Sequence, residues 1–249
     1  MRGGVIRLFR FAGITVFLHY TWFLIAAFFI PSYTKHYSSA IWGVFEYLAV
    51  FVIVLIHEFG HALACRQVGG VANRIILWPL GGIAFVNPPR RAGAYLWSIA
   101  AGPLVNVALI PILALLGDFV AQSPSSFAVT DAFLFFRDLK RLNYGLLIFN
   151  LLPIFPLDGG QILRGLLWYP FGEIRSLQIA SVVGLVGGVA LGLVAVLLMG
   201  LDLWVIIIAF FLVSRAWVGW QTAKAMIAAE KAGIPVSPSP TAQEDPVPR

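Results

Sequence analysis

The chain has 249 residues, of which 60% are hydrophobic and only 11% are charged. Soluble domains carry about 25% charged residues, so this composition excludes an ordinary soluble protein and indicates a membrane protein. The 17 Lys and Arg residues outnumber the 11 Asp and Glu residues. They lie between apolar runs and form no single stripe, which argues against a nucleic-acid partner. The one cysteine, Cys65, excludes an internal disulfide and a zinc cluster built from several cysteines.

The first ten residues are basic and lead into an apolar run, as a secretory signal also does. The run from Ile14 to Ile30 is long for a signal core, and no clear cleavage site of small residues follows it. We therefore expect this segment to remain in the chain as its first membrane span.

Membrane-spanning helices need about 20 mostly apolar residues, and this criterion predicts six of them. The expected spans are 13–30, 41–66, 95–117, 142–168, 177–199 and 201–219. The last two are separated by only three residues, so they must form a tight helical hairpin. Four glycines in the fifth span, at positions 184, 187, 188 and 192, would let neighbouring segments approach closely.

Three segments outside the predicted spans have their own character. Residues 74–89 are too short and too rich in Gly and Pro for a helix, and they are expected to form a short hairpin or re-entrant loop beside a cavity. Residues 123–141 mix phenylalanines with charges, as an interfacial helix does. The Pro- and Ser-rich tail from Ile234 is expected to be disordered.

The basic residues indicate the orientation of the chain. With six spans both termini share one side, which also holds thirteen of the 17 basic residues, so the positive-inside rule predicts cytoplasmic termini and a cell-membrane location. The expected organisation is a membrane domain over residues 1–220 and a cytoplasmic tail over 221–249. The loops leave no room for a further folded domain, which needs about 50 residues.

The sequence His57-Glu58-Phe59-Gly60-His61 near the cytoplasmic end of the second span predicts a zinc site. Residues four apart on a helix share one face, so both imidazoles can bind the same ion. Glu58 can then take a proton from a water bound to that ion. Ionisable residues are rare in membrane spans and are usually functional there, which makes coincidence a poor explanation.

Catalytic zinc needs a third protein ligand, and Asp158 is the candidate. Among the six aspartates it alone lies deep in an apolar span, within a stretch that Pro153, Pro156 and Gly159 break. Counted at 1.5 Å per residue from the cytoplasmic ends of their spans, Asp158 and the two histidines lie at one depth. The alternative is a carboxylate that caps the broken helix.

These motifs resemble those of the site-2 proteases, which are zinc-dependent intramembrane metalloproteases. The histidine motif matches, and so does the family pattern Asn-x-x-Pro-x-x-Pro-x-Asp-Gly, which begins here at Asn150. Weaker matches are Pro79-Leu-Gly81-Gly82, Ala101-Gly102-Pro103-Leu-Val-Asn106 and the first-span His19. Thr15 and Gln161 replace a Pro and an Arg of many relatives, and neither position should hold metal.

The resemblance implies a polytopic α-helical membrane protein that binds one Zn²⁺ and cleaves membrane-spanning segments of other proteins in regulated intramembrane proteolysis. Some branches of the family add peptide-binding or nucleotide-binding domains. This chain is expected to be a compact form without them, so its regulation differs or involves a partner. The substrate and the oligomeric state are not predicted.

Further polar residues in the spans have two interpretations each. Asn150 and Asn106 could bind the substrate backbone or the developing oxyanion, or could satisfy carbonyls of broken helices. His19 could assist the active site or make an ordinary hydrogen bond. Gly81 and Gly82 could let an unwound substrate add to a strand edge. Cys65 is expected to be a packed core residue.

Two other functions fit parts of the pattern. A metal transporter also buries His and Asp, but its ligands would be spread over several depths. A catalytically silent relative would bind membrane proteins without cutting them, and the base Glu58 argues against that alternative.

Overall fold

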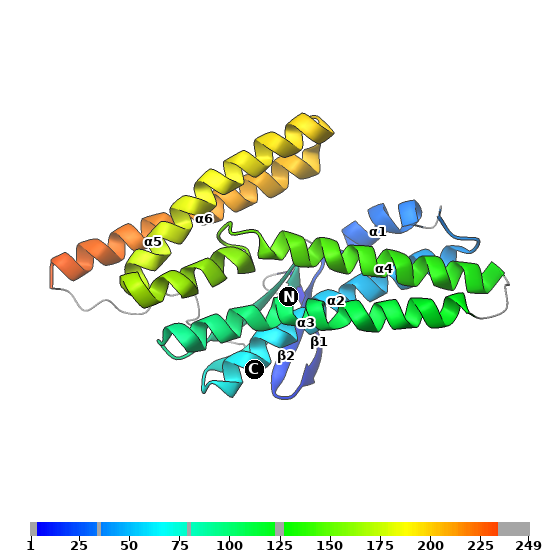
Figure 1. The fold of residues 1–249 in the computed structure, drawn as a ribbon, viewed down its shortest axis with the longest axis horizontal. Helices are drawn as coiled ribbons and strands as arrows, with labels where there is room; N and C mark the ends of the chain where they lie inside the picture. The colour runs from blue at the N-terminus through cyan, green and yellow to red at the C-terminus, as the bar shows by residue number, and fades with distance from the viewer. Residues whose placement is uncertain (1–3, 34–35, 79–80, 123–126, 234–249) are drawn as a thin grey trace. The chain divides into compact units, whose positions relative to one another are not determined.

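The computed structural model describes residues 4–33, 36–78, 81–122 and 127–233 (Figure 1). It forms two compact units, Met1–Pro88 with Ala100–Phe149 and Pro89–Ile99 with Asn150–Arg249. In chain order the elements are β1 (Val5–Phe11), β2 (Ile14–His19), α1 (Thr21–Tyr33), α2 (Ala40–Gln67), β3 (Val71–Trp78), β4 (Gly81–Asn87), α3 (Ala92–Ala121), α4 (Phe127–Leu151), α5 (Asp158–Met199) and α6 (Leu203–Lys231).

A four-stranded sheet in the first unit has the order β1-β2-β3-β4. The pairs β1–β2 and β3–β4 are antiparallel hairpins, and β2 runs parallel to β3. The hairpin predicted after the second span is therefore confirmed as β3 and β4. The helix predicted over 13–30 is wrong in its first part, because Ile14–His19 is a strand and the helix begins only at Thr21.

One face of this sheet packs on α2. Alternate residues of β2 and β3, including Ile14, Val16, Ile75 and Leu77, are fully buried and form a core cluster with Val54 and Ala62 of the helix. A strand buried on one face produces this alternation because successive side chains point to opposite faces. The sheet thus fixes the half of α2 that carries the histidine motif.

The helices α3 and α4 complete the first unit around the other half of α2. Ile53 of α2, Leu113 of α3 and Leu139 of α4 form a second buried cluster. The interfacial helix predicted over 123–141 is not separate, because α4 runs without a break from Phe127 to Leu151. Residues 123–126 lie outside the described part.

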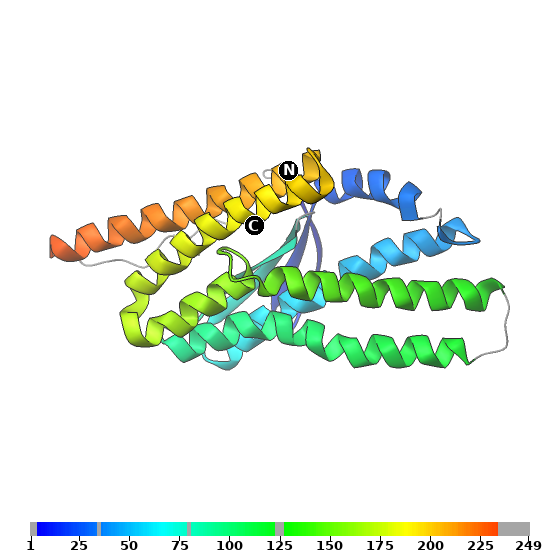
Figure 2. The same ribbon diagram turned by 45° about the horizontal axis from the view of Figure 1, so that its top comes forward.

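The second unit is built on a long helical hairpin. The helices α5 and α6 lie side by side in both views (Figures 1 and 2), as the three-residue link predicts. Helix α5 is kinked at Gly172, which has a positive φ of 78°. Helix α6 continues to Lys231, twelve residues beyond the predicted end of the sixth span at 219. The predicted disordered tail, 234–249, lies outside the described residues.

The glycines of α5 face two partners. A Cβ on Gly188 or Gly192 would meet Val213 or Ala209 of α6, which is the close helix approach that the sequence predicts. A Cβ on Gly184 or Gly187 would instead meet the segment Ile154–Phe155. The glycine stripe therefore packs both on α6 and on the segment before Asp158.

Four described helices are long and apolar enough to cross a membrane. They are Ala40–Gln67, Ala92–Ala121, Asp158–Leu198 and Leu203–Lys231. Helix α1 has 13 residues, about 20 Å of rise against a hydrocarbon core of about 30 Å. The chain is a mostly helical, multi-pass membrane protein with a small sheet, and the predicted count of six spans is not confirmed.

Candidate metal centre

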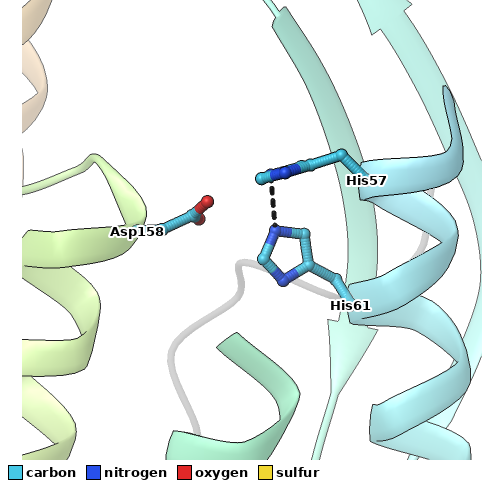
Figure 3. A group of neighbouring side chains, drawn as sticks. All are labelled: His57, His61 and Asp158. Atoms are coloured by element: carbon cyan, nitrogen blue, oxygen red, sulfur yellow. Dashed lines mark hydrogen bonds between the residues drawn. The ribbon is translucent and has the colours of Figure 1, made fainter. Parts of the chain in front are cut away.

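The two histidines of α2 lie one turn apart on the same face, as their spacing predicts. Their Nε2 atoms are 3.1 Å apart and are joined by the dashed line in Figure 3. His57, Glu58 and His61 are 5%, 6% and 6% exposed, within a helix that qualifies as a membrane span. Three ionisable side chains are thus buried on two successive turns.

The spacing of these nitrogens suits zinc. Zinc binds imidazole nitrogen at about 2.0–2.1 Å in tetrahedral geometry, which places two such ligands roughly 3.3 Å apart. The Nε2 separation of 3.1 Å is close to that value. The pair of imidazoles therefore fits a zinc ion with little rearrangement.

Gly102 of α3 leaves the space that the imidazoles fill. A Cβ at this position would overlap the ring of His61 and come within 2.8 Å of Nε2 of His57. A glycine here lets the backbone of α3 lie directly against both rings. The match to a family pattern at Gly102 thus has a physical reason in this chain.

Glu58 is held by the strand next to it. The backbone N–H of Ala84 in β4 donates to Oε2 of Glu58 at 2.8 Å, and a Cβ on Gly82 would overlap the Glu58 carboxyl group. In the described part of the chain, β4 is at the edge of the sheet and has β3 as its one neighbour. The carboxylate predicted as the base therefore lies at the free edge of β4, beside the glycines predicted to contact substrate.

His57 has a polar partner on its other nitrogen. Its Nδ1 lies 2.5 Å from Oδ1 of Asn106, and Nδ2 of Asn106 donates to Oδ1 of Asn143 at 2.7 Å. Nδ2 of Asn143 in turn donates to the backbone carbonyl of Asn106 at 2.9 Å. Asn143 was missed by the sequence analysis because it matches no motif, although a polar residue on a mostly apolar part of α4 was a usable signal.

Asp158 belongs to the second unit, where it is the first residue of α5 (Figure 3). Helix α4 ends at Leu151 and α5 begins at Asp158, so the helix break predicted from the prolines is confirmed. Nε2 of Gln161 donates to the carbonyl of Pro156 at 3.0 Å, and its Oε1 accepts from the Tyr95 hydroxyl. Gln161 thereby links the segment between α4 and α5 to the first turns of α3.

The other predicted residues have ordinary surroundings. His19 ends β2, bonds to Thr21 through Nδ1 at 2.7 Å and stacks on Trp78, so its role near the active site stays a prediction. Asn150 is half-buried near the end of α4. Cys65 is fully buried in the cluster between the sheet and α2, which confirms it as a packed residue.

Glu46, eleven residues before His57, lies in a separate buried contact. It accepts a hydrogen bond from the Tyr37 hydroxyl at 3.0 Å. Burial and this bond raise the pKa of Tyr37 above its ordinary value. Glu46 therefore fastens the segment before α2 to the helix.

Comparison with known proteins identifies the family. The sequence profile of Peptidase family M50 matches residues 120–195. A zinc metalloprotease of Methanocaldococcus jannaschii is 33% identical over 179 residues, 72% of this chain and 50% of the relative. Stage IV sporulation protein FB of Bacillus subtilis is 34% identical over 120 residues, 47% of this chain and 38% of that protein.

A solved structure has the same fold. The site-2 protease from Methanocaldococcus jannaschii matches with a TM-score of 0.62 and 30% identity, over 87% of this chain and 95% of that chain. The chain spans about half the length of the curated relatives it matches. Its fold, its zinc-type histidine pair and these similarities agree, and the chain belongs to the site-2 protease family of zinc metalloproteases.

Proposed function

We propose that this chain is an intramembrane zinc endopeptidase, which hydrolyses a peptide bond in or near a transmembrane segment of another membrane protein. One observation carries the proposal. Two imidazoles with the spacing of zinc ligands and a buried carboxylate lie on one apolar helix, and the carboxylate accepts a hydrogen bond from the edge strand β4. A transporter or a binding-only relative has no need of this base.

Asp158 is the proposed third ligand. His57 and His61 each offer an imidazole nitrogen and Asp158 offers a carboxylate oxygen, which are donor atoms that zinc binds in proteins. Two imidazoles and one carboxylate are a ligand set that catalytic zinc uses, with a fourth position left for water. The helix break supports this role, since it frees the start of α5 to carry a polar side chain inside an apolar stretch.

Bound zinc supplies a water whose pKa is lowered to about 7 and polarises the carbonyl that is attacked. The residues of the chain move the protons. Glu58 accepts the proton of the water through its carboxylate and then donates it to the leaving amine. The hydrogen bond from Ala84 to Oε2 of this carboxylate fixes where the proposed base lies beside β4.

The substrate is proposed to bind as an extended strand along β4. A peptide bond in a helix is shielded by its own hydrogen bonds, so a transmembrane substrate must unwind before cleavage, and a strand edge can replace those bonds. Gly81 and Gly82 begin β4 and permit close approach of a second backbone. Asn150 is proposed to donate to the substrate backbone or the oxyanion.

The proposed setting is the cell membrane, with both termini cytoplasmic. The excess of basic residues on the terminal side supports this orientation. The count of six spans, which places both termini on one side, stays a proposal beside the four helices that qualify by length and composition. Membrane lipid surrounds the helices, and a regulatory partner controls cleavage by analogy with the family.

The test is co-expression of the chain with candidate membrane substrates, with zinc measured in the purified protein. Glu58→Gln should keep one zinc per chain and lose cleavage, because the amide preserves size but cannot accept the proton. Asp158→Ala should lose zinc and cleavage. Asp202→Ala is the matched control, since Asp202 caps the start of α6, and it should keep both. Cleavage by Glu58→Gln would show that another group is the base.

A further inference from the structure

His57, Asn106 and Asn143 form a hydrogen-bond network, and the last bond of this network fixes which groups donate and which accept. The backbone carbonyl of Asn106 can only accept, so the side-chain group of Asn143 that faces it must be the amide Nδ2. Oδ1 of Asn143 then faces Nδ2 of Asn106. This leaves Oδ1 of Asn106 toward His57.

The direction of the hydrogen bonds in this network decides which nitrogen of His57 carries its proton. An amide oxygen has no hydrogen to give, so Nδ1 of His57 must donate to Asn106. The proton of the neutral ring is then on Nδ1, and Nε2 presents a lone pair. Nε2 is the atom that lies 3.1 Å from Nε2 of His61, on the side where the proposed ion binds.

We propose that Asn143 and Asn106 are positioning residues of the zinc site, which set the tautomer and ring orientation of His57 from two neighbouring helices. This inference rests on the proposed metal-binding role of His57. It gives Asn106 a different task from the substrate contact that the sequence suggests. With exposures of 1% and 0%, Asn106 and Asn143 are fully buried, and their hydrogen bonds join them to each other and to His57.

An amide suits this position better than a carboxylate does within a membrane. Metal-binding histidines commonly donate their second N–H to a carboxylate or a backbone carbonyl. A further buried carboxylate would carry a large desolvation cost, whereas an amide oxygen accepts the same bond without a charge. The amide needs a second residue to keep it from flipping, because its oxygen and nitrogen have nearly the same shape. Asn143 meets that need.

Four variants separate positioning from packing. Asn106→Leu removes the acceptor of His57, and Asn143→Leu removes the group that orients the acceptor. Asn106→Asp restores an oxygen toward His57 and serves as the rescue. Leu139→Ala is the matched control, since Leu139 is buried on α4 one turn before Asn143 and makes apolar contacts in the second buried cluster.

Zinc affinity is measured by chelator competition on the full-length protein in nanodiscs. Loss of an outer-shell partner typically weakens metal affinity by about 10- to 100-fold, which we expect for Asn143→Leu and Asn106→Leu. Leu139→Ala should bind zinc as the wild type does, and Asn106→Asp should bind zinc more tightly than Asn106→Leu because it restores an acceptor for His57. Nitrogen NMR of the zinc-free chain labelled at its four histidines should show His57 protonated on Nδ1 in the wild type and as a tautomer mixture in Asn143→Leu.

Wild-type affinity and an unchanged His57 tautomer in Asn143→Leu would overturn the positioning role and leave the protease proposal standing. An equal loss of affinity in Leu139→Ala would also overturn it, since packing would then explain the effect. A wild-type chain that binds no zinc would refute the protease proposal and this inference together.

Discussion

Single glycines determine whether the site has room to form. Gly102 and Gly82 lie against the imidazoles and against the Glu58 carboxyl group, respectively. Each is where a neighbouring backbone approaches a functional side chain. Substitution there tests one part of the site at a time.

Gly102→Ala should strongly reduce zinc binding, because the new methyl group overlaps His61 and crowds His57. Gly117→Ala on the same helix is the control, since its Cβ would make an ordinary 3.5 Å contact with Phe136. Zinc stoichiometry and thermal stability of the two purified variants would be compared. Full zinc binding by Gly102→Ala would argue that the imidazoles lie elsewhere when metal is present.

Gly82→Ala should act on the base and spare the metal. The methyl group displaces the Glu58 carboxyl group from its place beside β4, so the rate of cleavage should fall while zinc content stays at the wild-type level. Gly145→Ala provides the control, since a Cβ there meets nothing within 4 Å. Loss of zinc together with activity would assign Gly82 to the metal site instead.

The sequence predicted the residues that carry the chemistry of the site better than the residues that hold them in place by hydrogen bonds. The i, i+4 spacing of His57 and His61 and the carboxylate between them are a local pattern, and a helix keeps that pattern intact. Asn106 lies 49 residues after His57, and Asn143 lies 37 residues after Asn106. Their hydrogen bonds therefore form only in the tertiary structure. Hydrogen bonds between distant residues leave no spacing rule in a single sequence.

At the scale of elements, the segment before α5 depends on the helical hairpin. Gly184 of α5 lies against the backbone of Phe155, and Gly219 of α6 lies against its ring. The segment that leads to Asp158 is therefore packed against both helices of the hairpin. The hairpin thus has a structural task beyond crossing the membrane.

Gly184→Ala should disturb this segment, because its Cβ would lie 2.7 Å from the carbonyl oxygen of Phe155, and backbone yields less easily than a side chain. We expect weaker zinc binding through Asp158 and a lower thermal stability. Gly188→Ala on the next turn is the control, since its closest contact would be a side-chain methyl of Val213 at 3.2 Å, and Leu212 and the Val213 backbone nitrogen would lie at an ordinary 3.6 Å. Identical zinc affinities in the two variants would separate the hairpin from the metal site.

Strand β2 shows that an apolar run can be mistaken for part of a membrane helix. Ile14–His19 is as hydrophobic as a membrane helix, and hydropathy alone cannot distinguish a buried strand from a helical turn. Its β-branched residues and the alternation of buried and half-buried side chains favour a strand. Strand β2 pairs with β3, and the partners Thr15 and Arg74 are 59 residues apart in the sequence. No local pattern could indicate this pairing.

At the scale of the whole molecule, composition predicted a multi-pass membrane protein, and four helices of suitable length and apolar character confirm it. The six-span count failed to be confirmed because one apolar run folded as β2 followed by the short α1, and the run over 142–168 is divided between α4 and α5. His57 and His61 belong to one compact unit and Asp158 to the other. The equal depth counted along the spans is the sequence argument that links them.

Proteolysis by this chain is proposed to require zinc in the histidine site. The most direct measurement is cleavage of a purified transmembrane substrate by the purified chain, before and after metal removal with a chelator and after return of one equivalent of zinc. Cleavage by the wild type should stop without metal and return with zinc, and His57→Ala should not be restored. Cleavage that continues in the metal-free chain would contradict this requirement.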